Sequence, residues 1–481
     1  MSKRYCRLWI LVLAVTLSAA WGQDNSTPQP SGAGQDSSQE PTPGYGQDNP
    51  PAPITENPPL SGLDTPGLEP HAAPLSYLQP GVIVAETADS NVADTLGQSS
   101  VRSVTEGLGS LTLQRLWSHY DLAIDYLGGA AYYNARGLGW KQLQQMDLEQ
   151  KITWRRGQLA LRDSFSYLPE GNFGAEYGAI GSQGITSVGA SGFGTFWGGN
   201  FFGGLGQVPR ISNLALMDVS ENLNPKSAVT AAVGYAFTHF TGNPAPGTVP
   251  LVNNSFLGSS QLSVQTGYNR IISPHNQIAL VYGYQGFDFS AQGTAFHSHV
   301  IQGMFGHRIS GRMDFLIGAG PQITSLSLGT AKDTRIGVAG RGQFRYHFTK
   351  TTLELMYDRY ETSGSGFFAG AQSDIAQARL SRPITRTWNG YITLGYARNS
   401  RLQPLAANAV QANTYNYGFA SVGVRHRFSR TLSMFGTYQF NEIAFDSSFC
   451  LTQGVSQCNR ISQRHLVTVG LEWTPRPIRI D

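Results

Sequence analysis

The amino-acid sequence predicts an all-β fold, a transmembrane antiparallel β-barrel of about eighteen strands, with about sixteen as the alternative count. Charged residues make up 14 % of the 481 residues, against roughly 25 % in soluble globular domains. Glycine (56) and aromatic residues (11 %) are abundant. Beyond the first twenty positions no apolar run reaches about 18 residues, which excludes a bundle of transmembrane helices. Apolar residues dispersed in this way are typical of membrane-spanning strands.

Residues 1–22 have the pattern of an export signal peptide. A basic start is followed by an apolar run over 8–20, which is too short to remain as a membrane anchor. We expect cleavage before Gln23, with cleavage after Ala20 as the alternative.

Residues 23–80 have the composition of a disordered, acidic, proline-rich linker. They hold 13 of the 25 prolines and seven acidic residues, and they contain no lysine or arginine. Such a segment cannot bury enough apolar surface to offset the entropy lost on ordering. We expect a solvated periplasmic tether. The alternative is an acidic arm that enters an arginine-lined pore, or that contacts a periplasmic partner or the cell wall.

Charge divides between the two parts of the exported chain. Loss of the signal peptide leaves 31 basic and 31 acidic residues. The linker carries −7, so residues 81–481 carry +7. No basic tract remains, so nothing in the sequence supports nucleic acid as a partner.

From residue 81 onward, polar and apolar residues alternate. In 261–269 one face carries the apolar or small residues Leu262, Val264, Thr266 and Tyr268. In 336–348 one face carries Ile336, Val338, Phe344, Tyr346 and Phe348, and the other carries Arg341, Gln343, Arg345 and His347. This period of two indicates half-buried strands. The strands run for about ten to fifteen residues, enough to cross a bilayer at a tilt, whereas average strands have about 5–6.

The connections alternate between tight turns and longer links. Downstream of residue 226 the tight turns centre on 273–276, 310–312, 349–351, 385–387 and 429–430. The longer links cover roughly 242–257, 289–295, 325–332, 363–373, 399–412 and 443–459. Upstream, six further strands are expected near 80–88, 102–116, 120–133, 142–155, 158–168 and 209–222. Tight turns at one end and longer loops at the other are typical of outer-membrane barrels.

In this pattern, residues 81–481 resemble the porin-like outer-membrane β-barrel proteins of Gram-negative bacteria. The final segment also fits, because Val467, Val469, Leu471 and Trp473 alternate with residues of the opposite face. Barrels of this family typically end on an aromatic residue that the outer-membrane assembly machinery recognises. The resemblance implies this role for Trp473, although eight residues follow it. It further implies an outer-membrane location, contact with outer-membrane lipid and passage of small polar solutes.

An eighteen-stranded barrel is too wide for its own side chains to fill, so it leaves an aqueous channel unless something plugs it. The predicted pore-lining residues lie opposite the lipid face: Arg162, Arg308, Arg341, Arg345, Arg379, Asp314, Glu354 and Asp358. Asp147, Glu149 and Glu472 share that face. Two compatible hypotheses follow, a transverse field that orders polar solutes and cross-strand ion pairs that stabilise the wall. Since both signs of charge are present, the sequence predicts no ion selectivity.

The link 169–208 is forty residues long and contains thirteen glycines and several aromatic residues. It is the third outer loop, which folds inward and narrows the pore in trimeric porins. An exposed loop of this composition would present apolar surface to water, so we expect it to constrict the lumen. A mobile outer flap is the alternative.

Cys450 and Cys458 remain after Cys6 leaves with the signal peptide, and in an exported chain they predict one local disulfide. Two free thiols are the alternative. The chain contains no GxSxG, HExxH or phosphate-loop motif, so we predict no enzymatic activity, cofactor or metal. An enzymatic site at the outer rim is an alternative, with His297 or His299, near Asp288, as the general base. A structural or export-associated barrel without free diffusion is the other alternative function.

Overall fold

The computed structural model describes residues 60–62, 76–92, 100–135, 138–168, 209–241, 258–289, 293–328, 331–364, 367–403, 412–451 and 459–480. All of them belong to one compact unit, Thr42–Asp481. Within these ranges, no helix is long and apolar enough to cross a membrane.

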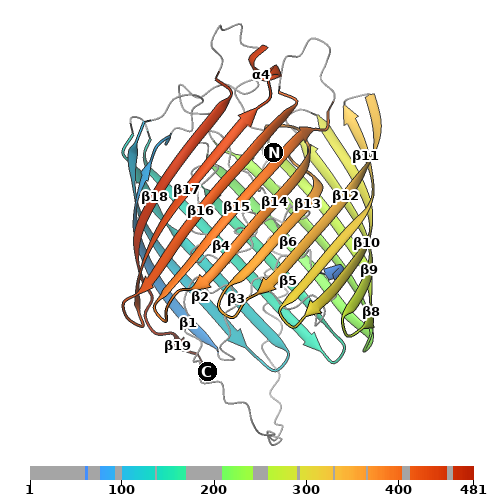
Figure 1. Cartoon of the computed structure of the whole chain (residues 1–481), viewed down its shortest axis with the longest axis horizontal. Helices are drawn as coiled ribbons and strands as arrows, with labels where there is room; N and C mark the ends of the chain where they lie inside the picture. The colour runs from blue at the N-terminus through green and yellow to red at the C-terminus, as the bar shows by residue number, and fades with distance from the viewer. Residues whose placement is uncertain are drawn as a thin grey trace, which may run out of the picture. The chain divides into compact units, whose positions relative to one another are not determined.

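Long antiparallel strands make up almost all of the described chain (Figure 1). The first nine are β1 (Tyr77–Asp89), β2 (Arg102–Leu116), β3 (Tyr120–Tyr133), β4 (Gly139–Trp154), β5 (Gly157–Leu168), β6 (Arg210–Asn224), β7 (Ser227–Phe240), β8 (Ser259–Ser273) and β9 (Asn276–Phe289). The next nine are β10 (Thr294–Ser310), β11 (Met313–Leu328), β12 (Ala331–His347), β13 (Thr352–Thr362), β14 (Ala371–Pro383), β15 (Trp388–Arg401), β16 (Thr414–Arg427), β17 (Leu432–Phe445) and β18 (Ile461–Trp473). The remaining elements are η1 (Leu60–Gly62), α4 (Ser448–Leu451) and β19 (Ile478–Arg479).

The sheet closes on itself. Each strand from β1 to β18 pairs with its sequence neighbours, and β1 also pairs with β18 in a register that joins Val82 to Trp473 and Asp89 to Leu466. Closure leaves no free edge between the first and last strands. The predicted eighteen-stranded barrel is therefore confirmed.

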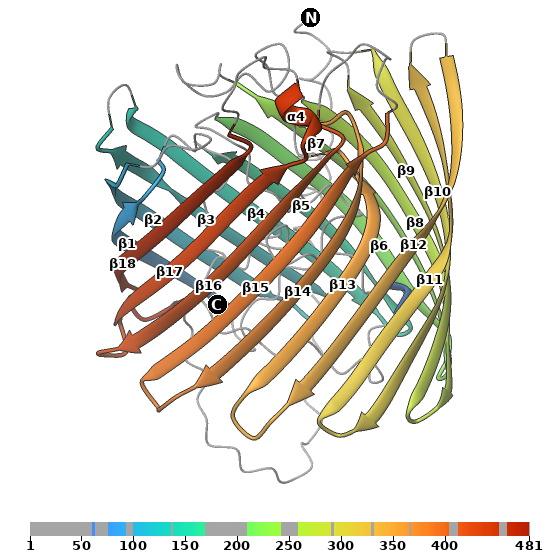
Figure 2. The same ribbon diagram turned by 45° about the horizontal axis from the view of Figure 1, so that its top comes forward.

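The two ends of the barrel differ in their connections. At one end, here called the turn end, short turns such as Trp117–His119 and Gly311–Arg312 join the strands, and β18 finishes there (Figures 1 and 2). The other end, here called the loop end, carries most of the longer links and α4. This alternation of short and long links matches the sequence prediction.

Several boundaries differ from the prediction. The expected outer link 325–332 is wrong, because β11 continues to Leu328 and β12 begins at Ala331, with pairing between Leu328 and Ala331. The ladder continues through the polar positions of the expected link, with Ser325 opposite Thr334 and Ser327 opposite Lys332. In addition, β1 begins at Tyr77. Pro80 fits within β1 because the pairing of β1 with β18 starts only at Val82. The missing N–H of proline therefore removes no hydrogen bond to β18.

The wall divides between β12 and β13. At the turn end the two strands pair from His347↔Thr352 to Gly340↔Arg359, and this pairing ends there although β12 extends back to Ala331. Above that point β13 curves away from β12 (Figure 2). Beyond Arg359, β13 remains paired with β14 as far as Thr362↔Ala371.

Candidate functional site: the barrel interior

The outward face of the barrel is apolar. In β18, Val467, Val469 and Leu471 are about half exposed, whereas Leu466, Thr468 and Glu472, which alternate with them, are buried. Aromatic residues gather near the two ends of this outward face, with Trp117, Tyr120, Trp154 and Trp388 near the turn end and Tyr132, Trp140, Tyr235 and Tyr396 nearer the loop end. An apolar band between aromatic girdles is the surface of a membrane-spanning barrel.

The inward face is mostly polar. The predicted alternation in β8 is confirmed, because Gln261, Gln265 and Asn269 are buried while Leu262 and Tyr268 are exposed. Buried glutamines continue along β9, β10 and β11 as Gln277, Gln285, Gln302 and Gln322. Amide side chains can donate and accept hydrogen bonds, so this wall can exchange hydrogen bonds with polar molecules.

Charges of both signs meet on β11, β12 and β13. Arg345 Nε lies 3.0 Å from Asp314 Oδ1 of β11. Arg341 Nε lies 3.2 Å from Asp358 Oδ1 of β13. All four side chains are nearly inaccessible. The arginines of the twelfth strand thus contact carboxylates of both neighbouring strands, as the sequence predicted.

A second ionic group lies on β4, β5 and β6. Arg162 of β5 contacts Glu149 of β4 and Asp218 of β6. Lys151 Nζ adds a contact of 2.7 Å to Glu149 Oε1. Cross-strand ion pairing is therefore present in both groups. In the second group Arg162 contacts a carboxylate on each neighbouring strand, and in the first group each arginine of β12 contacts a carboxylate on one neighbouring strand.

The other predicted pore residues have matching positions. Glu354 is directly opposite Arg345 on one side and Arg379 on the other, and its Oε1 accepts a 2.8 Å hydrogen bond from Gln343. Arg308 is directly opposite Asp314. The strand period of two places each of these residues on the inward face. The structure therefore brings seven of the eight predicted residues, those from β10 to β14, onto one section of the wall.

Two further ion pairs, which were not predicted from the sequence, lie near the closure of the barrel. Arg464 of β18 pairs with Asp89 of β1, and both are buried. Arg425 Nη2 of β16 lies 2.6 Å from Glu472 Oε2 of β18. Alternation places Arg464 on the inward face of its strand, but only closure of the sheet brings it to Asp89.

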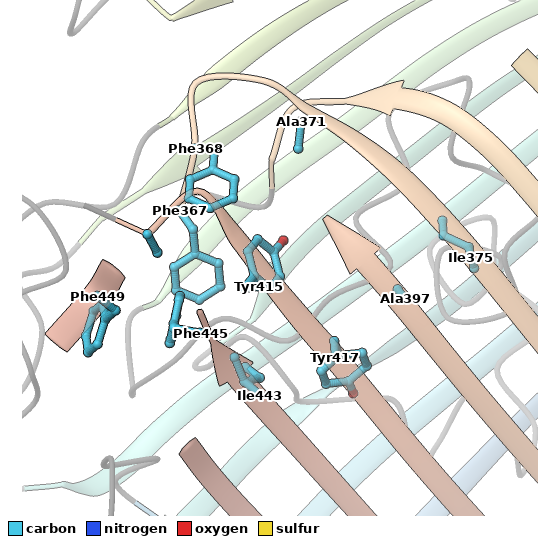
Figure 3. Close-up of a cluster of buried hydrophobic side chains, with 11 residues drawn as sticks. Phe367, Phe368, Ala371, Ile375, Ala397, Tyr415, Tyr417, Ile443, Phe445 and Phe449 are labelled. Atoms are coloured by element: carbon cyan, nitrogen blue, oxygen red, sulfur yellow. The ribbon is translucent and has the colours of Figure 1, made fainter. Parts of the chain in front are cut away.

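An aromatic cluster lies at the loop end. Phe367 and Phe368, from the link after β13, pack near Tyr415, Phe445 and Phe449 (Figure 3). The ring centroids of Phe367 and Tyr415 are 5.1 Å apart, and those of Phe367 and Phe445 are 5.6 Å apart. The link after β13 therefore packs onto β16, β17 and α4.

The same link also contacts the strands on its other side. Ala369 packs in a buried cluster with Phe287, Phe289, Phe296 and Leu326 of β9, β10 and β11. Gly370 has a φ of +91°, and a Cβ there would lie 2.5 Å from Cε1 of Phe296. Glycine is therefore required by both the backbone and the close approach. The link therefore contacts buried residues of β9 to β11 on one side of the gap between β12 and β13, and residues of β16 and β17 on the other.

The two candidate general-base histidines, His297 and His299, face outward. Tyr284 and His297 are joined by a hydrogen bond of 2.9 Å, and Tyr282 and His299 by another of 2.9 Å. All four belong to exposed pairs on β9 and β10. The four side chains therefore lie on the outer surface of the wall, away from its polar inner face.

Several predicted features lie outside the described residues. These are the signal peptide, the link 169–208, most of the linker 23–80, and Cys458. Cys450, in α4, is disulfide-bonded, and its pairing with Cys458 stays a prediction.

No protein-family profile and no curated protein matches the chain. Among solved structures, OccK5 (OpdH) of Pseudomonas aeruginosa is 11 % identical, with 85 % of this chain and 100 % of that chain covered and a TM-score of 0.41. OccK2 (OpdF) of the same organism is 9 % identical, with 82 % and 98 % covered and a TM-score of 0.41. OccAB2 of Acinetobacter baumannii is 8 % identical, with 84 % and 98 % covered and a TM-score of 0.42.

Proposed function

We propose that the chain is a porin-like outer-membrane channel for passive diffusion of small polar solutes. The observation that carries the proposal is the contrast between the two faces of the closed barrel, an apolar outer belt and an inner wall of amides, hydroxyls and ion pairs. Barrels of eighteen strands are wide enough for an aqueous lumen. The eight charged residues predicted from the sequence would line the pore, and Trp473 would be recognised during assembly.

The orientation follows from the two ends of the barrel. Outer-membrane barrels place short turns in the periplasm and longer loops outside the cell. The turn end is then periplasmic, and the link 169–208, outside the described residues, is an outer loop that we propose constricts the lumen.

Paired charges inside the lumen would act on solutes as well as on the wall. Arg341 and Arg345 on one strand, with Asp314 and Asp358 on its neighbours, create a field directed across the pore. Such a field favours polar solutes that can align their dipoles. Because every arginine of this group has a carboxylate partner, selectivity would depend on solute shape and dipole more than on net charge.

A planar bilayer experiment tests the proposal. Refolded full-length protein should give discrete conductance steps, and its permeability to sugars and amino acids in liposome-swelling assays should fall with solute size. Protein that is folded, as judged by heat-modifiable migration, but gives no conductance would contradict the channel.

That negative result would favour a structural or export-associated barrel without free diffusion. The cluster around Phe367 and the contacts of Leu60 inside the wall are the observations that support this second candidate, because both place side chains within the barrel.

A further inference from the structure

Part of the linker is bound to the inner wall of the barrel. Residues Leu60–Gly62 form η1 and contact β7, β8, β9 and β10. Leu60 is fully buried and Ser61 is 2 % exposed. A segment whose composition predicts a solvated tether therefore contains a short stretch that is as buried as a protein core.

The Leu60 side chain is covered by an apolar patch on an otherwise polar wall. Ala279 and Val281 of β9, Met304 of β10 and Leu316 of β11 form one buried cluster with it. Ala279 pairs directly with Met304, so the patch crosses adjacent strands at one level. Apolar residues on a water-facing wall are unfavourable unless something covers them, and Leu60 covers these.

Polar contacts fix the backbone next to this patch. Leu60 N–H donates to Asn269 Oδ1 over 3.2 Å. Thr230 Oγ1 donates to Ser61 Oγ over 2.8 Å. Asn269 is directly opposite Ala279, so the hydrogen bond and the apolar contact belong to the same row of the sheet. The segment is therefore held by two hydrogen bonds to side chains of the wall in addition to the burial of its leucine.

One glycine of the wall leaves room for the segment. Gly267 is paired with Thr230 on one side and with Val281 on the other. A Cβ at Gly267 would lie 2.4 Å from the Cβ of Ser61. No side chain can fit there while Ser61 is docked, because real Cβ contacts do not approach so closely.

The sequence around Leu60 carries charge opposite to that of a cavity near the docked segment. This cavity of ≈ 510 Å³ is lined by Arg155, Arg156 and Lys226 at the turn end, and also by Asn269. In the sequence, Leu60 is flanked by Glu56 and Asp64 within a range that has seven acidic and no basic residues. Opposite charge on the two partners favours capture of the segment from the turn end.

We propose that this region of the wall, here called the latch site (Thr230, Gly267, Asn269, Ala279, Val281, Met304 and Leu316), is a peptide-binding site whose ligand is the chain's own Leu60–Ser61. Docking holds Leu60–Gly62 against the inner wall and narrows the passage. The proposal rests on the proposed channel function, and it makes the linker a displaceable part of the pore.

Disulfide trapping in the full-length chain tests the docking separately from conduction. In a background with Cys450→Ser and Cys458→Ser, the pair Leu60→Cys and Ala279→Cys should cross-link on mild oxidation and change migration on a denaturing gel without reductant. The matched control is Leu60→Cys with Leu280→Cys, the next residue of β9, which faces outward and is 59 % exposed. Equal cross-linking of both pairs, or none in the first, would overturn the proposal.

Conductance tests the narrowing. Gly267→Leu in the full-length chain should displace Ser61 and raise single-channel conductance by about twofold or more, since conduction follows the narrowest cross-section. Gly303→Leu is the control, because a Cβ at Gly303 meets nothing within 4 Å. Leu60→Asp should act like Gly267→Leu without touching the wall. Unchanged conductance in both latch variants would refute the narrowing.

A peptide added in trans completes the test. A synthetic peptide of residues 54–68 should restore the lower conductance of the Leu60→Asp chain when added at the turn end, and a peptide with Leu60→Asp should not. Equal action of both peptides would overturn specific binding at the latch site. Failure of every form to conduct, with cross-linking intact, would reject the channel function and leave the docking in place.

Discussion

Asp89 at the end of β1 and Arg464 in β18 form a buried ion pair across the seam where the barrel closes. Arg464 Nε lies 2.9 Å from Asp89 Oδ2, and the two residues are 375 positions apart in the chain. Asn91 adds a hydrogen bond of 3.2 Å from its side-chain amide to Ser462 Oγ. The first and last strands are therefore joined by side chains at the loop end as well as by the backbone ladder.

Removal of one partner of this pair should destabilise the closed barrel. Arg464→Met leaves a buried carboxylate without its cation, which typically costs about 3 kcal/mol or more. The measurement is the urea midpoint of the heat-modifiable form in detergent. Arg335→Met is the matched control, since Arg335 and Asp333 form an exposed pair of a kind worth at most about 1 kcal/mol. Equal losses in the two variants would contradict a special role for the seam.

Neutralisation of the twelfth-strand arginines should change ion preference. Replacing Arg341 and Arg345 by glutamine leaves Asp358 and Asp314 without their cations, so the lumen becomes more negative and should favour cations. Reversal potentials in a salt gradient should shift accordingly, with little change in conductance. Arg359→Gln is the control, because Arg359 lies on the outward face of β13 beside Asp374. A shift toward anions would refute the expectation.

Shortening the long outer loop should widen the channel. Deletion of residues about 175–203 removes most of the link 169–208 and touches neither β5 nor β6, so the barrel should still fold. If the loop folds inward, single-channel conductance should rise several-fold. The same conductance in the deletion and the full-length chain would identify the loop as an outer flap.

Asp446, just beyond β17, should make the loop end sensitive to acid. Burial alone would raise the pKa of its carboxyl, but hydrogen bonds from Ser448, Asn413 and Thr414 hold the pKa below the ordinary 3.8. Its Oδ2 accepts the amides of Asn413 at 2.8 Å and Thr414 at 2.7 Å.

A lowered pKa means that this stabilisation is complete above pH 3.8 and is lost as the pH falls through the depressed value. Protection of the Asn413 and Thr414 amides from hydrogen exchange, corrected for intrinsic rates, should follow that course. Asp446→Asn should reduce protection already at neutral pH. Protection that is independent of pH in the original chain would contradict this assignment.

The disulfide prediction has a direct chemical test. Cys450 is disulfide-bonded, and with Cys6 removed by signal cleavage Cys458 is the expected partner. Alkylation of the unreduced exported protein should label neither cysteine, and peptide mapping should recover 450 and 458 in one linked fragment. Labelling of Cys458 would show a different pairing. Loss of the bond should affect folding little, because it closes a short loop outside the wall.

The alternation of polar and apolar residues, together with the short and long links, was sufficient to predict the barrel and its strand number. It also predicted which side chains face the lipid and which face the lumen. In β8 and β12 the predicted lipid and lumen faces are the observed ones, because a period of two fixes each side chain once one face is known. The pairing of Arg341 with Asp358 was also predictable, since β12 and β13 are joined by a predicted tight turn, which fixes their register.

Contacts between distant parts of the chain came only from the tertiary structure. Leu60 occurs in a range whose average composition predicts a tether, and nothing local marks it as buried. Its partners Ala279, Met304 and Leu316 are brought to one level by strand stagger around the barrel. The seam pair of Asp89 with Arg464, and the division of β12 from β13, likewise depend on closure and on packing of the link 363–370. Alternation is a local property of each strand. Which segment packs against the inner wall depends instead on the side chains that several strands together present to the lumen.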